Sequence, residues 1–424
     1  MATGIIAEYN PFHNGHKHQI DCIKKLKKHQ DGGLIACISG SITQRGEFAL
    51  LDKWQRAGAA VKNGANLVIE LPAAFACRSA QDFATGGVRL LDSLGIVDTL
   101  AFGTAYPEIE KLQLAADFQP EAHREALQQK LKGGLSYGAA LSQLIGENTG
   151  LNAEMLTEPN TILAIEYLRA LKNNGGIRPL PLPRTGAGHN DTAVKGEFAS
   201  GTAIRQLAMQ GQFRQLMQLV PKATLSAIEN TAMYPDSKKQ LPLMIWKLLS
   251  LAAEEIAAIY GVGEGMEYRL KEAASKPDCA SSYSALIQEL ATRRYPATRI
   301  QRTLMHLLLG STKDKIAEMT ASGPLYIRVL AFDDMGRQLL KDIRQKTSLP
   351  IITKVTEYLN RRDMQHPDRL SPLQRMLYMD IAAANLRELC LSPLPSNPQG
   401  EQQIRLNADF TTSPVYMDRT SLSL

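Results

Sequence analysis

The sequence predicts an α/β protein, with a doubly wound parallel sheet in the first half and an α-rich second half. In the first hundred residues, short apolar runs alternate with longer amphipathic segments. The apolar runs are continuous, which is typical of strands buried on both faces of a parallel sheet. After about residue 210 strand-like runs almost disappear, and helical spacing of apolar residues dominates.

The first half shows a repeated strand–helix pattern. We expect strands over residues 3–9, 34–39, 66–71 and 98–103, and helices over 16–28, 52–63 and 80–94. Right-handed crossovers between parallel strands would place these helices on both faces of the sheet. Residues 106–150 become helical and more polar, which predicts an insertion over the rim of the sheet. A helix over 161–172 follows, and then a strand over 178–183 whose three prolines confine it to an edge or an end.

The second half is predicted to fold mainly as helices. Residues 220–321 carry the helical pattern, and strand-like runs return only at 328–331 and 349–352. The chain of 424 residues exceeds the size of one ordinary core. We therefore expect an α/β domain over residues 1–209, with its helical insertion at about 106–150, and a mainly helical domain over 210–424. We expect the last fifteen or so residues to form a loosely packed tail.

Composition and charge are those of a soluble globular protein. Hydrophobic residues make up 44% and charged residues 21%, and the net charge of +6 permits a polyanionic partner without requiring one. The five cysteines form no CxxC pair, so neither a disulfide framework nor a cysteine-rich zinc site is supported, and we predict no metal site. No apolar stretch is long enough to span a bilayer, and the first residues enter a strand without a basic signal region. We expect a cytoplasmic protein without a membrane partner.

The most informative motif is EYNPFHNGH at residues 8–16, between the first strand and the first helix. Ligands of parallel sheets bind at the carboxyl ends of the strands. There a helix start offers backbone N–H groups and a positive dipole end, which suit phosphate. His13 and His16 add ring N–H donors, and Gly15 leaves room for a phosphate chain. The motif predicts charge stabilisation at an α-phosphate during in-line attack. The structural alternative is that His13 caps a turn and His16 packs at the helix start.

Several longer segments carry a family resemblance. GIIAEYNPFHNGH is followed by SGSITQRGEFALLDKWQRA, NGANLVIELP, SAQDFATGG, EPNTILAIEYLRAL, PRTGAGHNDT, GTAIR and TRRYPATRIQR. Over nearly its whole length the sequence resembles the bacterial tRNA(Met) cytidine acetate ligases of the HIGH-motif nucleotidyltransferase superfamily. The resemblance implies a ligase that joins acetate to ATP, giving acetyl-adenylate and pyrophosphate. The acetyl group then passes to N4 of the wobble cytidine in elongator tRNA(Met). Mg²⁺ is expected to accompany ATP, and the helical domain is expected to bind tRNA.

The resemblance also implies an ATP site in which His13 and His16 are catalytic. The residues implied to contact ATP are Ile6, Ala7, Glu8, Tyr9, Asn10, Pro11, Phe12, His13, Asn14, Gly15, His16, Lys17, His18, Gln19, Gly103, Asn160 and Arg184. Gly103 ends a central strand, where a side chain would collide with adenine or ribose. Asn160 starts a helix and can equally be its N-cap. Arg184 follows a strand end, where a guanidinium can face phosphate, but its spacing alone fits a solvated surface charge.

Three segments depart from the family pattern. The usual FGSE reads FGTA at residues 102–105, SGNFVQRGE reads SGSITQRGE at 39–47, and a loop tyrosine is replaced by His189. None of these changes affects the HxGH histidines. They concern how the nucleotide and the acid are held rather than the use of ATP.

Two further groups are candidate phosphate contacts. Arg45 and Lys53 follow the second strand and can meet pyrophosphate or the tRNA backbone. The alternative is a loop with surface ion pairs and Trp54 in the core. Thr202 and Arg205 belong to a turn that resembles the one closing the phosphate site in the superfamily, although a simple helix cap by Ser200 fits equally well.

A basic stretch in the second half is a candidate RNA surface. It contains no acidic residue and includes Arg293, Arg294, Tyr295, Arg299 and Arg302. On a helix starting near residue 298, Arg299, Arg302 and His306 would share one face. The basic character continues with Arg328, Arg337, Lys341, Arg344 and Lys346. Such a surface suits phosphate contacts and stacking on RNA bases, although charge runs are usually solvated faces.

Two other functions fit parts of the sequence. NPxHxGH-like strings also occur in small-molecule adenylyltransferases, but these would not explain a helical half with clustered arginines. The third hypothesis is a non-catalytic RNA-binding protein with a decayed nucleotide site. The intact His13, Gly15 and His16 argue against it.

Overall fold

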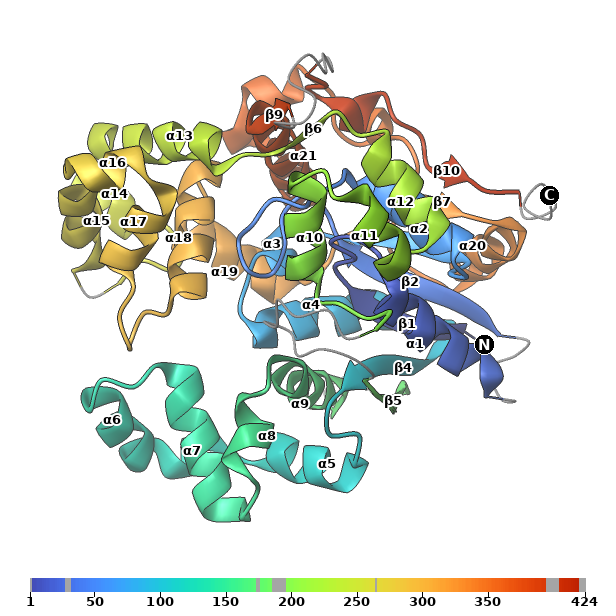
Figure 1. The fold of residues 1–424 in the computed structure, drawn as a ribbon, viewed down its shortest axis with the longest axis horizontal. Helices are drawn as coiled ribbons and strands as arrows, with labels where there is room; N and C mark the ends of the chain where they lie inside the picture. Colours follow the sequence, from blue (N-terminus) through green and yellow to red (C-terminus); the bar gives the residue numbers. More distant parts are fainter. Residues whose placement is uncertain are drawn as a thin grey trace.

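A mostly parallel sheet forms the centre of the molecule (Figure 1). The computed structural model describes residues 2–26, 32–172, 176–184, 196–263, 265–393 and 404–418. The strand order is β10-β7-β3-β2-β1-β4-β5, with β8 paired to β7. These strands are β1 (Ala2–Ala7), β2 (Gly33–Ser39), β3 (Leu67–Leu71), β4 (Val97–Thr104), β5 (Arg178–Pro183), β7 (Ile327–Phe332), β8 (Ile351–Ile352) and β10 (Val415–Tyr416). β1 to β5 run parallel, as predicted, and the proline-rich β5 lies at one edge.

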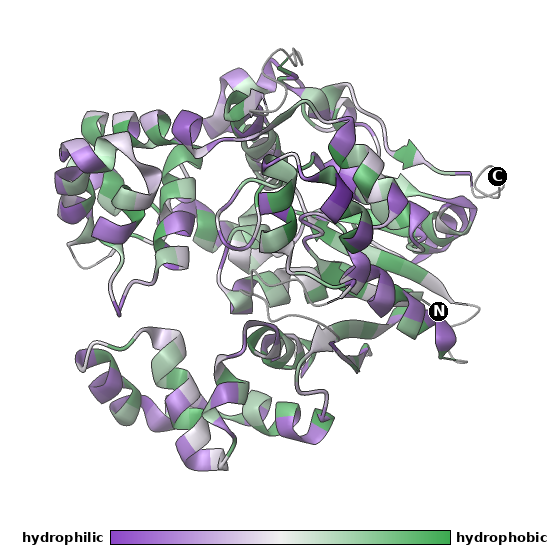
Figure 2. Cartoon of the chain, in the orientation of Figure 1, coloured by the Kyte–Doolittle hydropathy of each residue, from purple (hydrophilic) through white to green (hydrophobic). Residues whose placement is uncertain are grey.

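Helices cover both faces of the sheet. On one face, α1 (Asn14–Lys25) and α2 (Lys53–Lys62) bring Ile20 and Val61 against Ile5 and Ile38 of the strands. The core on the opposite face includes α3 (Ala73–Ala76), α4 (Ala80–Asp92), α9 (Pro159–Lys172) and α20 (Asp334–Lys346). The strands are hydrophobic in Figure 2, and every residue of β2 is buried. This is the doubly wound α/β arrangement that the sequence predicts.

The second half of the chain contributes part of this sheet. β7 pairs antiparallel with β3, which places Val329 beside Ile69 and Arg328 beside Glu70. β8 and β10 in turn pair parallel with β7. The division expected at residue 209 therefore does not separate the sheet from the second half. The physical reason is that a continuous apolar strand is buried most effectively by joining an existing sheet.

Residues 404–418 pack against the sheet. β10 pairs with β7, the ring of Tyr416 lies 5.6 Å from that of Phe332, and Asp409 is buried. The prediction of a loosely packed tail is therefore wrong for residues 410–418, because the pairing of β10 with β7 and the buried carboxylate of Asp409 just before them hold them in place. Residues 419–424 lie outside the described chain.

Two helical groups lie beside the sheet (Figure 1). Between β4 and β5, the chain forms α5 (Ile109–Asp117), α6 (Arg124–Lys132), α7 (Tyr137–Thr149) and α8 (Ala153–Thr157), in keeping with the helical pattern of residues 106–150. The second group has its own apolar core and contains α13 (Ser237–Ser250), α14 (Ala253–Ala257), α15 (Met266–Ala274), α16 (Pro277–Ser281), α17 (Tyr283–Leu290) and α18 (Ala297–Leu309). In Figure 1 the first group lies below the second.

The remaining elements connect these parts. A third apolar cluster joins α10 (Gly201–Met209), α11 (Phe213–Leu219) and α12 (Lys222–Glu229). β6 (Met233–Pro235) pairs antiparallel with β9 (Leu391–Pro393), and α19 (Lys313–Ser322) and α21 (Pro372–Leu389) pack on the sheet's core. Within the described ranges, no helix combines the length and the apolar character needed to cross a bilayer.

Candidate active site

The HxGH turn begins α1 at the carboxyl end of β1. His13 is the N-cap of the helix, and its Nδ1 accepts a hydrogen bond from the backbone N–H of Gly15 at 3.0 Å. Nδ1 of His16 accepts from the backbone N–H of His13 at 3.2 Å, which completes a capping box. A neutral imidazole that accepts at Nδ1 carries its proton on Nε2. The turn therefore prepares two Nε2–H donors at a helix N-terminus.

Aromatic packing fixes both imidazole rings. The rings of His13 and His16 stack with centroids 3.7 Å apart and an interplanar angle of 24°. Tyr9 and Phe12, which are both buried, contact the ring of His16 at centroid distances of 4.8 and 5.5 Å. The structural alternative is therefore also true, since His13 caps the helix and His16 packs at its start. Because capping engages Nδ1, it does not compete with donation from Nε2.

A buried guanidinium holds the strand ends beneath this turn. Nη1 of Arg56 donates to the carbonyl oxygens of Glu8 at 2.6 Å and Ser39 at 3.0 Å, and Nη2 donates to that of Gly40. Nε donates to the carbonyl oxygen of Leu51 at 3.2 Å. Burial lowers the pKa of Arg56 to about 10, so the group stays charged at neutral pH. Arg56 therefore joins the carboxyl ends of β1 and β2 to the start of α2.

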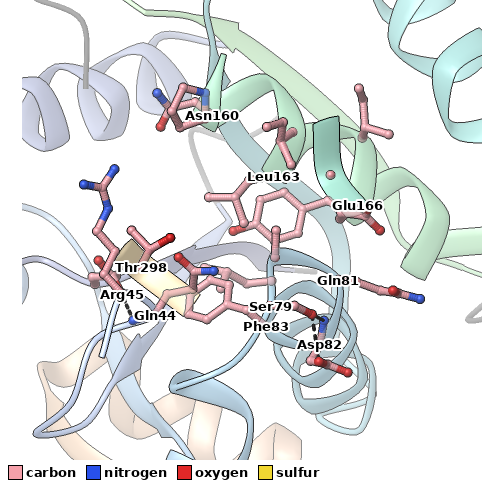
Figure 3. A pocket seen from close by; sticks show the side chains of 18 of the residues that line it. Gln44, Arg45, Ser79, Gln81, Asp82, Phe83, Asn160, Leu163, Glu166 and Thr298 are labelled. Atoms are coloured by element: carbon pink, nitrogen blue, oxygen red, sulfur yellow. Dashed lines mark hydrogen bonds between the residues drawn. The ribbon is translucent and has the colours of Figure 1, made fainter. Parts of the chain in front are cut away.

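A cleft of about 1190 Å³ opens in front of the histidine turn. Its walls come from the carboxyl ends of β1 and β4, the first turns of α1, α4, α9 and α10, and the cleft-facing sides of α7 and α18. In Figure 3, Asn160, Leu163 and Glu166 lie along α9, opposite Ser79 and Phe83 of α4. The sequence-predicted residues that line the cleft are Ile6, Ala7, Glu8, Tyr9, Asn10, His13, Gly15, His16, His18, Gln19, Arg45, Gly103, Asn160, Arg184, Thr202, Arg205, Arg294, Arg299 and Arg302.

Asn160, Arg184 and Gly103 meet on one wall of the cleft. Nη1 of Arg184 donates to Oδ1 of Asn160 at 2.9 Å. A Cβ added to Gly103 would lie 3.2 Å from Cγ of Arg184, so the missing side chain makes room for the arginine. Asn160 is not the helix cap: the carboxylate of Glu158 accepts from the backbone N–H of Thr161 at 2.6 Å and from Nδ2 of Asn160 at 2.7 Å. Asn160 is thus oriented by its neighbours on both sides.

Comparison with known proteins identifies the family of this chain. Its sequence matches the HIGH Nucleotidyl Transferase family over residues 1–403. The chain belongs to this family. A tRNA(Met) cytidine acetate ligase of Caldanaerobacter subterraneus subsp. tengcongensis is 39% identical over 367 residues, covering 84% of this chain and 89% of the relative. The ligase of the same name from Syntrophotalea carbinolica is 35% identical over 425 residues, covering 98% of each.

Solved structures share the fold along the whole chain. Apo TmcAL of Thermotoga maritima matches with a TM-score of 0.86 at 29% identity, covering 99% of this chain and 100% of that chain. TmcAL of the same organism bound with alpha-thio ATP matches with a TM-score of 0.83 at 28% identity, with the same coverage. TmcAL of Thermotoga maritima, which shares this architecture, therefore binds an ATP analogue.

Four residues of the implied ATP segment do not line the cleft. Pro11 and Phe12 are buried beneath the turn. Nδ2 of Asn14 donates to the carbonyl oxygens of Gln218 at 2.8 Å and Glu197 at 3.0 Å, and Lys17 pairs with Asp21 one turn along α1. The prediction of direct nucleotide contacts differs from the structure at these positions. Successive side chains at a helix start point in different directions around the helix axis. An unbroken run of residues therefore cannot all face one cleft.

The prediction that Lys53 contacts phosphate is wrong. It is buried, and its Nζ lies 2.8 Å from Oε2 of Glu70 and 2.6 Å from Oδ1 of Asp409. Burial alone would lower the pKa of Lys53, but Asp409 and Glu70 outweigh it and raise the pKa. Lys53 forms ion pairs with these carboxylates and does not line the cleft, so it contacts neither pyrophosphate nor tRNA. Trp54 lies in the core, as the alternative predicted.

The neighbouring turn at residues 44–47 does reach the cleft. Its backbone is anchored because the N–H of Gln44 donates to Oε1 of Glu8. Burial raises the pKa of Glu8, and this hydrogen bond opposes the rise. Gly46 has a φ of +80°, and a Cβ there would lie 2.7 Å from the backbone nitrogen of Arg302. Only glycine lets this turn pack so closely against α18, which brings Arg45 into the cleft.

The turn before α10 also borders the cleft. Ser200 caps the helix by accepting from the backbone N–H of Ala203 at 3.1 Å. Arg205 donates to the carbonyl oxygen of Asn10 at 3.0 Å, to Glu47 at 3.3 Å and to the hydroxyl of Thr202 at 3.2 Å. Thr202 and Arg205 thus tie the histidine turn to residues 44–47, and both still line the cleft.

The basic stretch divides into cleft and core residues. Arg294, Arg299 and Arg302 line the cleft, whereas Arg293 is exposed and outside it. The expectation of an available aromatic ring at Tyr295 was wrong. Tyr295 is buried beneath the guanidinium of Arg299, which lies 4.5 Å from its ring centroid. His306 is buried against the carbonyl oxygen of Cys77, 2.8 Å from its Nε2, and burial lowers its pKa to about 4. His306 nevertheless shares the cleft wall with Arg299 and Arg302, as its helical spacing predicted.

The predicted extension of the basic surface is wrong at Arg328. Arg328 is buried in β7 beside Asp409, at 3.5 Å. Arg337, Lys341, Arg344 and Lys346 lie on α20 and do not line the cleft. The loop predicted at residues 186–201 falls mostly outside the described residues, and so does His189.

Several cleft residues were not singled out from the sequence. They are Tyr137, Phe83, Leu163, Glu166 and Tyr260. The available signal was an acidic residue within the otherwise apolar helix of the segment EPNTILAIEYLRAL. The others resemble ordinary core positions, and only the folded arrangement of α4, α7 and α9 brings them together.

Proposed function

We propose that this HIGH nucleotidyl transferase is an ATP-dependent tRNA(Met) cytidine acetate ligase. It activates acetate as acetyl-adenylate and transfers the acetyl group to N4 of the wobble cytidine of elongator tRNA(Met). Curated relatives of 35% to 39% identity carry this name, and a structural neighbour binds an ATP analogue. The observation that carries the proposal is the pair of imidazoles held as Nε2–H donors at the start of α1.

The first step needs stabilised negative charge. A carboxylate oxygen of acetate attacks the α-phosphorus of ATP, and pyrophosphate leaves. In this proposal, Nε2–H of His13 and His16 donates to the phosphate oxygens beside the dipole of α1. Preorganised donors of this kind each contribute about 3 kcal/mol to the transition state. Asn160 and Arg184 would hold the nucleoside side of the ligand.

Mg²⁺ enters this proposal as part of the substrate, MgATP. The described residues contain no cluster of three or more His, Cys, Asp or Glu side chains that could hold a metal ion. Phosphate oxygens and water would therefore supply most of its ligands, as is common for this cation.

The second step needs room for a nucleobase. The cytidine amine attacks the acetyl carbon, and AMP leaves, so no protein nucleophile is required. A wobble base must be splayed from its stack to reach the adenylate. Arg294, Arg299 and Arg302 line the same cleft and would contact the RNA backbone. We place the reaction in the cytoplasm, where the five free cysteines remain reduced.

Nucleoside mass spectrometry tests the proposal directly. Purified protein is incubated with unmodified elongator tRNA(Met), MgATP and acetate. We expect cytidine to gain one acetyl group, with release of AMP and pyrophosphate, and no product when acetate is omitted. A tRNA without cytidine at the wobble position is the matched control. A stable adenylated metabolite together with unchanged tRNA would contradict the proposal and favour a small-molecule adenylyltransferase.

A further inference from the structure

The cleft wall continues beyond Asn160 and Arg184. Tyr137 begins α7, while Leu163 and Glu166 lie on α9, and all three line the cleft. In Figure 3, Leu163 and Glu166 face Phe83 of α4. Glu166 follows Asn160 by six residues, which is about 9 Å along the helix. Asn160 and Glu166 are therefore less than two turns of α9 apart.

Within the described residues, only one of the two carboxylate oxygens of Glu166 accepts a hydrogen bond. Its side chain is 11% exposed, and Oε1 accepts from Nη1 of Arg169 at 2.7 Å. Arg169 is fixed in turn by the carbonyl oxygens of Ala115 at 3.1 Å and Ala116 at 3.4 Å. Oε2 makes no hydrogen bond with any described residue. Burial raises the pKa of Glu166, and Arg169 opposes the rise, so the group is more basic than an ordinary carboxylate.

Tyr137 presents an exposed aromatic ring inside the cleft. The residue is 49% exposed, it belongs to none of the apolar clusters of the described chain, and its hydroxyl has no hydrogen-bond partner there. Burial raises the pKa of Tyr137, and Arg169, Glu121 and Glu166 also act on it. Tyr137, Glu166 and Arg169 all line the same cleft. An exposed ring that shares a cleft with an apolar side chain and a carboxylate is more than the packing of α7 requires.

These groups match the chemistry of cytosine. A carboxylate is the side chain that accepts hydrogen bonds from the N4 amine of cytosine. Aromatic and apolar side chains stack on bases that have been splayed out of RNA. We propose that Tyr137, Leu163 and Glu166 form the acceptor-base subsite, in which Glu166 binds the cytidine N4 amine and takes its proton during transfer. This inference rests on the proposed function.

Acetyl transfer in this subsite forms one bond, breaks one bond and moves one proton. The N4 nitrogen attacks the carbonyl carbon of acetyl-adenylate, a C–N bond forms, and the bond from that carbon to the phosphate oxygen breaks. AMP leaves with the electron pair of the broken bond. Oε2 of Glu166 accepts one proton from N4 and later releases it to solvent. Arg169 keeps the carboxylate oriented throughout.

Separate assays of the two half-reactions test the subsite. Acetate-dependent exchange of pyrophosphate into ATP reports adenylate formation, and single-turnover acetylation of tRNA(Met) reports transfer. We expect Glu166→Gln to slow transfer by about 10²-fold or more, with far less effect on exchange. Transfer by the unaltered protein should accelerate with rising pH as Glu166 loses its proton, and Glu166→Gln should lose that dependence. Glu154→Gln, at an exposed acidic position of α8 outside the cleft, is the matched control.

Two variants of Tyr137 test the stacking role. Tyr137→Phe keeps the ring and should retain transfer, whereas Tyr137→Ala should weaken productive tRNA binding by about tenfold. If Glu166→Gln slows exchange as much as transfer, or lowers both together with thermal stability, its role is to tie α5 to α9 and the subsite is overturned. If Glu166→Gln leaves transfer unchanged, the subsite is overturned as well. If the unaltered protein exchanges pyrophosphate but never acetylates tRNA, the proposed function fails instead.

Discussion

Two sets of cations lie near the same edge of the sheet, and they differ in burial and in the groups that surround them. Lys53, Arg56, Arg328 and Arg387 are at most 3% exposed, and we call them the buried cations. Arg45, Arg184, Arg294, Arg299 and Arg302 line the cleft, and we call them the cleft cations. In the sequence both sets look alike, because each includes basic residues close to a polar motif. Only the first set is enclosed by acceptors of the protein itself.

Acceptors from distant segments produce the difference. Lys53 is neutralised by Glu70 and Asp409, and Arg328 also faces Asp409. Arg387 donates to the carbonyl oxygens of Ala49 at 2.8 Å and Leu50 at 2.7 Å. By contrast, Arg184 meets an amide oxygen and Arg299 an aromatic ring, neither of which carries negative charge. Arg184 and Arg299 therefore keep charge available for phosphate, while the buried cations hold the fold.

The largest expected effect is on stability, at a buried cation. Lys53→Met leaves Glu70 and Asp409 without their central cation, and breaking a buried pair in this way costs about 3–5 kcal/mol. Urea unfolding measures the loss. Arg184→Met is the matched change at a cleft cation and should alter stability by about 0.5 kcal/mol or less, while weakening ATP binding. Equal stability losses in the two variants would remove the distinction between the sets.

The next effect is on catalysis, at the histidine turn. Asparagine is a good N-cap, so His13→Asn can keep the acceptor for the N–H of Gly15 while removing the Nε2–H donor. We expect acetate-dependent pyrophosphate exchange to fall by about 10²–10³-fold, with thermal stability close to that of the unaltered protein. Exchange at the original rate would show that capping is the whole role of His13.

The pH dependence of stability tests the charge balance around the buried cations. Two positive charges, on Lys53 and Arg328, face two negative ones, on Glu70 and Asp409, so an ionised Asp380 would add unbalanced charge. Burial and Glu70 raise the pKa of Asp380 to about 8. In the unfolded chain Asp380 ionises near pH 4, so above that pH the folded state binds the extra proton.

Stability should therefore fall as pH rises from about 4 towards 8. Asp380→Asn cannot titrate, and its free energy of unfolding should decline less over this range. Urea unfolding at a series of pH values gives both slopes. Parallel slopes would mean that Asp380 is already ionised in the folded protein.

The smallest effect is expected at the cleft cations of α18. Arg299→Gln should weaken tRNA binding and reduce the slope of log affinity against log salt by about 1. Arg293→Gln, a few residues away but outside the cleft, should leave that slope unchanged. Filter binding of tRNA at several salt concentrations compares them. A larger effect at Arg293 would move the RNA contact out of the cleft.

These contrasts also show what the sequence can predict. The HxGH turn, its cap and the strands β1 to β4 depend on neighbouring residues, so their positions follow from local pattern. The fate of Lys53 depends on Asp409, which is 356 residues away, and that of His306 on Cys77, 229 residues away. Helical spacing placed Arg302 and His306 on one face, and both line the cleft, but it did not show that His306 is buried against Cys77. Glu166 gains its setting from the packing of α5 against α9, because Ala115 and Ala116 of α5 hold its partner Arg169.

The proposed function depends most on where the triphosphate lies. A crystal structure of this protein with alpha-thio ATP measures that position directly. We predict phosphate oxygens at about 3 Å from Nε2 of both His13 and His16, at the start of α1. A triphosphate bound elsewhere in the cleft, with both Nε2 atoms directed into apolar packing, would contradict the account.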